Sequence, residues 1–376
     1  MSTCPLAEIC GGCRYRDMEE DAYRELKKRH FATALKALGD ISFRLNPPVF
    51  IPDGTRRRAV FNFAYRQQKL LLGFNEAASH RIADIEACSL LTPALNGILP
   101  LVRRLLEALC REPFTLKKGK KVFTATITGG DVFVCEAANG IDIVLEYDAP
   151  LELNHRLIIS EICRTDDRII RLSHRRKAMD DAETIIEKAK PFIKAGRYDV
   201  IIPAGTFLQP SAAGQEALGN LVMQYMQGVK GQIADLFCGV GTFSYLLADL
   251  PDVSITAVDS SPALLRGFQE SVNRNRMPNV TIKRQNLFKY PLTAAELENL
   301  SAVVFDPPRA GAAAQCGELA AAVVKPPIVV AVSCNPATFV NDAAALLSGG
   351  YVLQEITMVD QFVYSNHSEL VAFFTK

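Results

Sequence analysis

The chain has 376 residues, 49% of them hydrophobic, and a formal net charge of +1 at pH 7. This length exceeds the size at which one hydrophobic core keeps growing, so it predicts two domains or one domain with a large extension. The apolar content excludes a disordered chain. No stretch has the roughly 18 uninterrupted apolar residues of a membrane span, and no signal-peptide core opens the chain, so we expect a cytoplasmic protein. The near-zero charge leaves nucleic acid open as a partner, since a local basic stripe is enough to neutralise phosphates.

Cysteine spacing near the N-terminus indicates a metal site. Ten cysteines in a chain expected to stay in the cytoplasm will be mostly reduced, so close spacings favour metal binding or catalysis over disulfides. Cys4, Cys10 and Cys13 lie close together, and Cys88 follows a predicted hairpin. Four thiolates suit a zinc ion or an iron–sulfur cluster, and the spacing alone does not choose between them.

The first two hundred residues have a mixed pattern. Residues 15–38 are typical of an amphipathic helix, and residues 90–109 also look helical. Alternating apolar residues at 56–73 predict a β-hairpin that turns at Gln67 and Gln68. Short β-type runs follow at 122–126, 132–134 and 157–159. This part of the chain is therefore predicted to be α+β.

After about residue 203, apolar strands alternate with helical segments, which is typical of a doubly wound parallel sheet. The predicted strands are 232–236, 254–258, 281–284, 302–305, 328–332, 350–358 and 370–375.

Polar residues follow three of these strands, at the edge where a doubly wound sheet binds its ligand. The run 235–241 contains Gly239 and Gly241, which let the backbone approach a ligand closely. Asp259 ends the next strand and can accept both ribose hydroxyls. The segment 306–308, Asp-Pro-Pro, fixes an extended edge rich in carbonyl groups. The glycine spacing does not complete the dinucleotide fingerprint, because Ser244 stands in place of its third glycine.

Cys334 is a candidate nucleophile. It lies between the strand 328–332 and a helical segment at 337–347, where helix N-terminal dipoles and a cation such as Arg309 favour a thiolate. The alternative for a single cysteine is a small buried apolar residue.

Four motifs together resemble those of the bacterial RNA uracil-5-methyltransferases, and the resemblance runs nearly the whole length of the chain. The motifs are Asp235-Leu236-Phe237-Cys238-Gly239-Val240-Gly241, Asp306-Pro307-Pro308-Arg309-Ala310-Gly311, Val332-Ser333-Cys334-Asn335-Pro336-Ala337-Thr338 and Asp360-x-Phe362-x4-His367-x-Glu369. The chain departs from the usual pattern in the last motif, where Val363, Tyr364 and Asn366 replace Pro, His and Gly and Ser368 replaces an apolar residue.

This resemblance implies a fold, a cofactor and roles for named residues. It implies an α/β protein with a C-terminal Rossmann-like, class I methyltransferase domain that uses S-adenosylmethionine (SAM), preceded by an α+β part that carries the four-cysteine site. Cys334 is implied as the nucleophile and Glu369 as the base, with His367 either a partner of Glu369 or a structural histidine. Residues implied around the cofactor or the target base, together with Gly239 of the glycine turn, are Gln209, Phe237, Asp259, Asn286 and Asp306. The implied domains are a cysteine-cluster segment with the hairpin (1–90), a central RNA-binding region that forms one unit with it (91–202), and the methyltransferase domain (203–376).

Within the resembling family, Cys4, Cys10, Cys13 and Cys88 imply a 4Fe-4S cluster with a structural role. The cluster-bearing members resemble ribosomal enzymes, so the predicted reaction is methylation of carbon 5 of a uridine in 23S ribosomal RNA, ahead of transfer RNA. The alternatives are an RNA cytosine-5-methyltransferase and a catalytically silent RNA-binding protein on the same scaffold. We expect RNA as the partner and no obligate protein partner.

Overall fold

The computed structural model describes residues 4–119, 121–178 and 181–376, which form two compact units. Unit 1 comprises Met1–Met18, Asp53–Phe192 and Pro203–Ala212, and unit 2 comprises Glu19–Pro52, Ile193–Ile202 and Ala213–Lys376. The grouping differs from a simple division at residues 90 and 202, because Glu19–Pro52 packs with the C-terminal part of the chain. The three predicted domains stay a prediction.

Unit 1 is built on a seven-stranded sheet in the order β11-β10-β9-β8-β3-β4-β5. Gln67 and Gln68 have φ of 50° and 62° and turn the chain between β3 and β4, which confirms the predicted hairpin. The strands of unit 1 are β3 (Arg58–Arg66), β4 (Lys69–Asn75), β5 (Ile82–Asp84), β6 (Pro113–Lys118), β7 (Lys121–Thr126), β8 (Gly129–Ala137), β9 (Gly140–Glu146), β10 (Ile169–Arg175) and β11 (Glu183–Glu187).

Two helices supply much of the apolar core of unit 1. The helix α2 (Pro93–Arg111) begins at Thr92, whose side chain accepts a hydrogen bond from the Leu95 N–H, and confirms the helix predicted at 90–109. The strand predicted at 157–159 is wrong, since these residues lie in the helix α3 (Leu153–Arg164). The buried residues of α3 recur every fourth position, at His155, Ile159 and Cys163, and a three-residue apolar run is too short to reveal this helical period.

Unit 2 contains a nine-stranded sheet whose main path is β1-β19-β20-β18-β17-β14-β15-β16, with β2 paired to β19. The pairs from β16 to β18 are parallel, and β20 runs antiparallel to both β18 and β19. All seven predicted strands are present. Unit 2 has the strands β1 (Arg44–Leu45), β2 (Val49–Phe50), β12 (Phe192–Ala195), β13 (Tyr198–Ile201), β14 (Gly231–Leu236), β15 (Val253–Asp259), β16 (Val280–Arg284), β17 (Leu300–Phe305), β18 (Ile328–Ser333), β19 (Val352–Asp360) and β20 (Glu369–Thr375).

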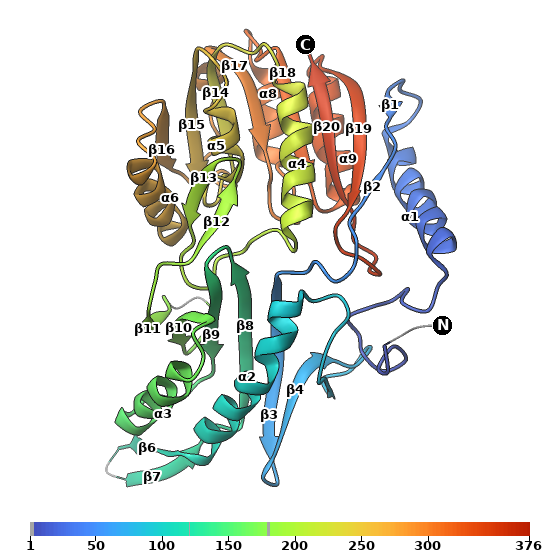
Figure 1. The fold of residues 1–376 in the computed structure, drawn as a ribbon. Coiled ribbons are helices and arrows are strands. Elements are labelled where there is room, and N and C mark those ends of the chain that lie inside the picture. The colour runs from blue at the N-terminus through green and yellow to red at the C-terminus, as the bar shows by residue number, and fades with distance from the viewer. Residues whose placement is uncertain (1–3, 120, 179–180) are drawn as a thin grey trace. The chain divides into compact units, whose positions relative to one another are not determined.

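Helices cover both faces of this sheet. In Figure 1, α4, α5 and α6 lie on the face turned to the viewer, and α8 and α9 lie behind it. The helix α1 packs against α9 through Phe31 and Leu35, and it confirms the core of the helix predicted at 15–38. The helices of unit 2 are α1 (Glu20–Leu35), the 3-10 helix η1 (Lys36–Leu38), α4 (Ala212–Tyr225), α5 (Thr242–Leu247), α6 (Pro262–Arg274), α7 (Ala294–Leu297), α8 (Ala313–Ala321) and α9 (Pro336–Ser348).

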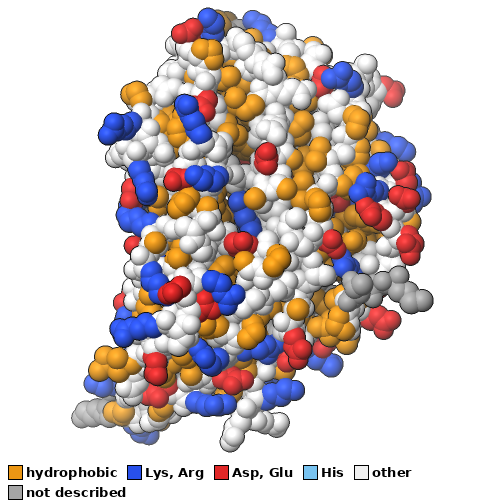
Figure 2. Space-filling model, viewed as in Figure 1, with side chains coloured by type: hydrophobic (Ala, Val, Ile, Leu, Met, Phe, Trp, Pro, Cys, Tyr) orange, Lys and Arg blue, Asp and Glu red, His pale blue; other side chains and the backbone are white. Residues whose placement is uncertain are grey.

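The distribution of charged side chains on the surface agrees with the nearly equal numbers of basic and acidic residues in the sequence. Lys and Arg side chains are interspersed with Asp and Glu on the face shown in Figure 2. Across the described residues, the helices all fall short of the length and apolar character that a membrane crossing requires.

Candidate active site

The order of the unit 2 strands reverses at β14, because β15 lies on one side of it and β17 on the other. Such a reversal opens a crevice at the carboxyl ends of the strands, where ligands of doubly wound sheets bind. The turn after β14 has positive φ at Phe237, Gly239 and Gly241. A Cβ at Gly241 would lie 2.3 Å from the Phe268 ring, so this turn needs glycine for packing as well as for conformation.

Asp259, at the end of β15, closes the next part of the crevice. Its two carboxylate oxygens accept hydrogen bonds from the backbone N–H groups of Gly239 (3.0 Å) and Ser261 (2.8 Å). These contacts fix the carboxylate beside the glycine turn. Each oxygen keeps a further lone pair for a ligand hydroxyl.

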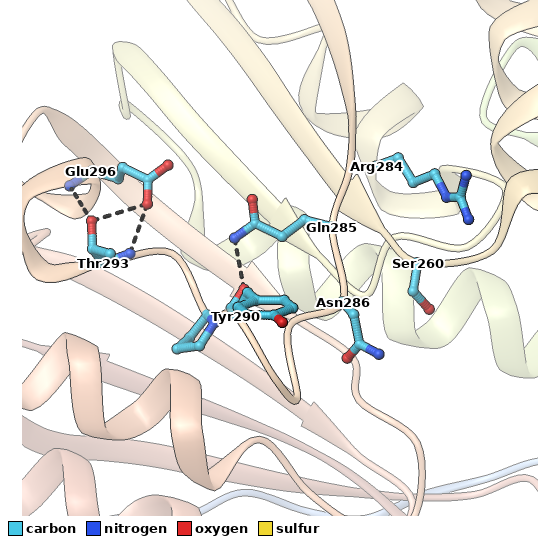
Figure 3. Close-up of a pocket in the computed structure, with 8 residues that line it drawn as sticks. Ser260, Arg284, Gln285, Asn286, Tyr290, Thr293 and Glu296 are labelled. Atoms are coloured by element: carbon cyan, nitrogen blue, oxygen red, sulfur yellow. Dashed lines mark hydrogen bonds between the residues drawn. The ribbon is translucent and has the colours of Figure 1, made fainter.

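A pocket of about 730 Å³ lies between Ser260, just after β15, and the segment that follows β16 (Figure 3). Asn286 lies in its wall with Tyr290, whose side chain is 69% exposed (Figure 3). The Asn286 side-chain oxygen accepts the N–H groups of Phe288 and Lys289, which holds the amide in place. The residues that line the pocket are Ser260, Arg284, Gln285, Asn286, Tyr290, Pro291, Thr293 and Glu296. Of these, only Asn286 was predicted from the sequence. Arg284 ends the predicted strand two residues before Asn286, and Tyr290 follows four residues after Asn286, so their positions near a strand end could have marked them as candidates.

The structure brings Cys334 and Glu369 together, although they come from different strand ends. Cys334 is half-buried after β18, and its pKa is raised to about 11 by burial and by the carboxylates of Glu369 and Asp306, while Arg309 opposes the rise. Arg309 favours the thiolate, as predicted, but burial and the two carboxylates outweigh its effect on the pKa of Cys334. Burial is the largest cause of the rise, and the motifs that predicted Glu369 and Asp306 near the reaction did not reveal the burial of the thiol.

Glu369 opens β20 and is only 2% exposed. Burial and the nearby Asp306 raise its pKa to about 8, while a hydrogen bond from Gln361 acts in the other direction. Among the described residues, the Glu369 Oε2 atom has no hydrogen-bond partner. Asp306, at the end of β17, has its pKa raised to about 7 by burial.

A third carboxyl group lies at the end of β14. The Ser244 hydroxyl donates to Asp235 Oδ2 over 2.5 Å, and burial with the charge of Asp306 raises the pKa of Asp235 to about 7. Three carboxyl groups whose pKa values are raised therefore lie along one sheet edge. A positively charged ligand at this edge would lower the pKa values of all three carboxyl groups. The same electrostatic attraction would strengthen binding of that ligand.

Arg309 links the loops around Cys334. Its backbone carbonyl accepts hydrogen bonds from Asn335 (3.2 Å) and Thr338 (3.1 Å), and its guanidinium lies 2.9 Å from the His367 ring nitrogen. Burial and the adjacent Arg309 lower the pKa of His367. A neutral His367 is suited to accept a hydrogen bond from the guanidinium.

Gln209 and the four N-terminal cysteines belong to unit 1, so their predicted roles stay predictions. The Gln209 carbonyl accepts a hydrogen bond from the Arg57 side chain. Within residues 4–119, 121–178 and 181–376, no group of three or more His, Cys, Asp or Glu side chains is arranged to hold a metal ion.

The four thiols are nevertheless neighbours. Burial raises the pKa of Cys13 to about 12, and Cys88, Cys10 and Cys4 add to the rise. The Gly12 N–H donates to Cys10 Sγ over 3.4 Å. The Arg56 side chain is close enough to interact with Cys88 and Cys13, and in the part of the chain that the structure describes its buried Nε has no hydrogen-bond partner. The four thiols therefore lie within electrostatic reach of one another, with the Arg56 cation beside Cys88 and Cys13.

The reversed strand order, the glycine turn and the carboxylate that ends β15 define a Rossmann-like sheet suited to a nucleoside-type ligand. The model of the tRNA (uracil-5-)-methyltransferase family matches residues 55–376. The chain belongs to this family, and it is an RNA (uracil-5-)-methyltransferase by that membership.

Proteins of similar sequence and structure agree with this assignment. An uncharacterized RNA methyltransferase of Brucella suis is 37% identical over 376 residues, which cover 99% of this chain and 84% of that protein. An uncharacterized RNA methyltransferase of Agrobacterium fabrum is 35% identical over 374 residues, which cover 98% of this chain and 82% of that protein. The structure of Pyrococcus abyssi tRNA (uracil-54, C5)-methyltransferase in complex with S-adenosyl-L-homocysteine superposes with a TM-score of 0.74, covering 99% of this chain and 86% of that one. At 22% identity this likeness shows the fold.

Proposed function

We propose that the protein methylates carbon 5 of a uridine in RNA through a covalent adduct between Cys334 and carbon 6 of the base. The observation that supports this most strongly is the convergence of Cys334, Asp306 and Glu369 at the ends of three neighbouring strands. A nucleophile and a buried base of raised pKa, within electrostatic reach of each other, are the two groups that the reaction needs.

Carbon 5 of uracil is a weak nucleophile until carbon 6 is attacked. Addition of the Cys334 sulfur to carbon 6 pushes the electron pair of the C5–C6 double bond into an enolate, whose carbon 5 takes the methyl group from the SAM sulfonium and releases S-adenosylhomocysteine. Glu369 then accepts the proton on carbon 5, the C5–C6 double bond re-forms, and the sulfur leaves. In its ionised form Glu369, with a pKa of about 8, is a stronger base than an ordinary glutamate, and a cationic ligand at this sheet edge would favour that ionised form.

The thiol must lose its proton before it adds to the base. Its pKa of about 11 leaves it protonated in the free protein near pH 7. SAM would bring a sulfonium cation as well as the methyl group, and a positive charge near Asp306 and Glu369 would lower the pKa of Cys334, whose proton would pass to solvent. Binding of the methyl donor thus prepares the nucleophile.

SAM is proposed to bind along the strand ends, with the ribose hydroxyls on Asp259 and the adenine in the pocket beside Asn286. Phe237 and Gly239 of the turn complete the proposed contacts within unit 2. Because a uracil stacked in RNA cannot be attacked on its face, the target nucleotide must be splayed out to reach Cys334.

The test uses purified full-length protein with SAM carrying a labelled methyl group and with undermodified 23S ribosomal RNA and transfer RNA in separate reactions. Digestion to nucleosides should place the label in 5-methyluridine, and the ribosomal RNA arm is expected to be the productive one. Label in 5-methylcytidine contradicts the choice of base. Absence of label from both RNAs, with a protein that binds SAM, favours the silent RNA-binding alternative.

We also propose that Cys4, Cys10, Cys13 and Cys88 hold a 4Fe-4S cluster with a structural role, next to the Arg56 cation. Protein purified without oxygen should contain about four iron atoms per chain and show visible absorbance from the cluster, as expected of four-thiolate ligation. Cys88→Ser should lose both signals, whereas Cys163→Ser, at a buried thiol outside the group, should keep them. Stoichiometric zinc without absorbance contradicts the cluster.

A further inference from the structure

The loop that carries the last motif is held by the helix α1. This loop, residues 361–368, connects β19 to β20 and ends at Glu369. Tyr23, Lys27, Phe31 and Leu35 recur every fourth position and form the buried side of α1. Residues at this spacing lie on one helix face, so a lysine occupies a core position here. Its side chain is 2% exposed.

Lys27 makes three contacts, all to the segment that leads to Glu369. Its ammonium lies 3.0 Å from Asp360 Oδ1 and donates to the carbonyl oxygens of Ser365 (3.1 Å) and His367 (2.5 Å). Burial lowers the pKa of Lys27, and Asp360 opposes this effect. A buried ion pair is no more stabilising than apolar residues of similar volume, so stability alone does not account for a lysine at this position.

Tyr23 makes the second connection. Its hydroxyl donates to Asp360 Oδ2 over 2.5 Å and accepts the N–H of Tyr364 over 2.9 Å. The Tyr23 and Tyr364 rings lie 5.1 Å apart. Tyr364 has a φ of 59°, a conformation that non-glycine residues adopt only when their surroundings hold them there. Tyr364 is also one of the residues that departs from the usual motif.

We infer that Tyr23, Lys27 and Asp360 are positioning residues, which set the place of Glu369 and of His367 by clamping the 361–368 loop from α1. This inference rests on the proposed role of Glu369 as the base that completes the reaction. The clamp fixes both ends of the loop: Asp360 lies immediately before it, and the His367 carbonyl lies two residues before Glu369. A displaced Glu369 slows removal of the carbon 5 proton more than it slows methyl transfer.

Tyr23→Phe tests the clamp without removing packing volume. The matched control is Tyr225→Phe, since the Tyr225 hydroxyl also bonds within unit 2, to Glu355 (3.1 Å) and Asn46 (3.3 Å), but not to this loop. We expect Tyr23→Phe to lower kcat roughly 10- to 100-fold, because small misplacements of a reacting group cost this much. The KM for SAM should stay within about twofold of the wild-type value, and methylated RNA should accumulate as a covalent adduct with the protein.

Hydrogen exchange of the 360–369 peptide measures the loop directly. Faster exchange is expected in Tyr23→Phe and in Lys27→Met, and not in Tyr225→Phe or in Lys28→Met, whose lysine pairs with Glu25 on the exposed side of α1. The inference is wrong if Tyr23→Phe matches Tyr225→Phe in kcat and adduct level. It is equally wrong if kcat, SAM affinity and melting temperature fall together, which is the signature of general destabilisation.

The same experiment separates this inference from the proposed function. If the wild-type protein makes 5-methyluridine and Tyr23→Phe behaves normally, only the clamp fails. If the wild-type protein makes no 5-methyluridine, the proposed function fails, and the exchange of the loop amides still decides whether α1 holds the loop.

Discussion

The two ends of the strand-end crevice in unit 2 differ in how their polar groups are satisfied. At the end proposed to bind adenosine, Asp259 accepts N–H groups from the glycine turn and from its own turn, and Asn286 accepts N–H groups from its own turn. At the reactive end, Glu369 and Asp306 are carboxyl groups whose pKa values burial raises. The first end is organised before the ligand arrives, whereas the second stores an unfavourable electrostatic arrangement that substrates can relieve. The comparison predicts that mutations at the reactive end alter chemistry and that mutations at the adenosine end alter affinity.

The largest effect is expected from Cys334→Ala. Without the sulfur, carbon 5 of the base has no activated electron pair, so turnover and adduct should both fall below detection while SAM binding persists. Methyl transfer and SAM affinity are followed in parallel, with Cys316→Ala, at a buried thiol of α8, as the control expected to retain turnover. Residual 5-methyluridine formation by Cys334→Ala would show that another group activates the base.

Glu369→Gln should reduce turnover nearly as much, but by blocking removal of the carbon 5 proton after methyl transfer. Loss of the base is expected to reduce turnover by roughly 10²- to 10⁴-fold. Methyl transfer precedes this step, so RNA carrying the new methyl group should remain attached to Cys334. Denaturing gels of the labelled RNA measure the adduct, and the exposed Glu25→Gln provides the control. Fast turnover without an adduct would assign the proton to another acceptor.

Much of unit 2 could be predicted from its sequence because the relevant signals are local. Each strand of the doubly wound sheet is a short apolar run with its functional residue at or just beyond its end, as with Asp259 at the end of β15 and Cys334 after β18. The raised pKa of Cys334 could not be predicted, since it depends first on burial of the thiol and then on carboxylates at the ends of other strands.

The contribution of α1 was equally hidden. Tyr23 and Asp360 are 337 positions apart, and no periodicity links them. The sequence of α1 indicates an apolar face, but Lys27 interrupts this apolar pattern, and its burial cannot be expected until its partner Asp360 is known. For the same reason, the sequence could not assign Glu19–Pro52 to the same unit as the C-terminal sheet.

A smaller effect, confined to affinity, is expected at the adenosine end. Asp259→Asn removes a charged acceptor, and a hydrogen bond to a charged group contributes about 1.5–3 kcal/mol, so the Kd for SAM should rise roughly 10- to 100-fold. Turnover at saturating SAM should be unchanged. Calorimetric titration compares this variant with Asp252→Asn, whose carboxylate pairs with Lys230 outside the crevice. A fall in kcat at saturating SAM would mean that the two ends do not divide affinity from chemistry.

The smallest expected effect is on stability, and it tests whether the reactive end is strained. The pKa of Glu369 is about 8 in the folded protein and 4.5 ordinarily, so the folded state holds this proton more tightly than the unfolded chain does. The stabilising contribution is thus present below about pH 4.5 and is lost as the pH rises through about 8. Glutamine does not titrate, so Glu369→Gln should melt roughly 2–4 °C above the wild type at pH 8.5, corresponding to ~1 kcal/mol, with a smaller difference at pH 5. Thermal melts at the two pH values measure this change. A difference independent of pH would show that the carboxylate is not destabilised by its burial, and the contrast between the two ends would then lie in geometry alone.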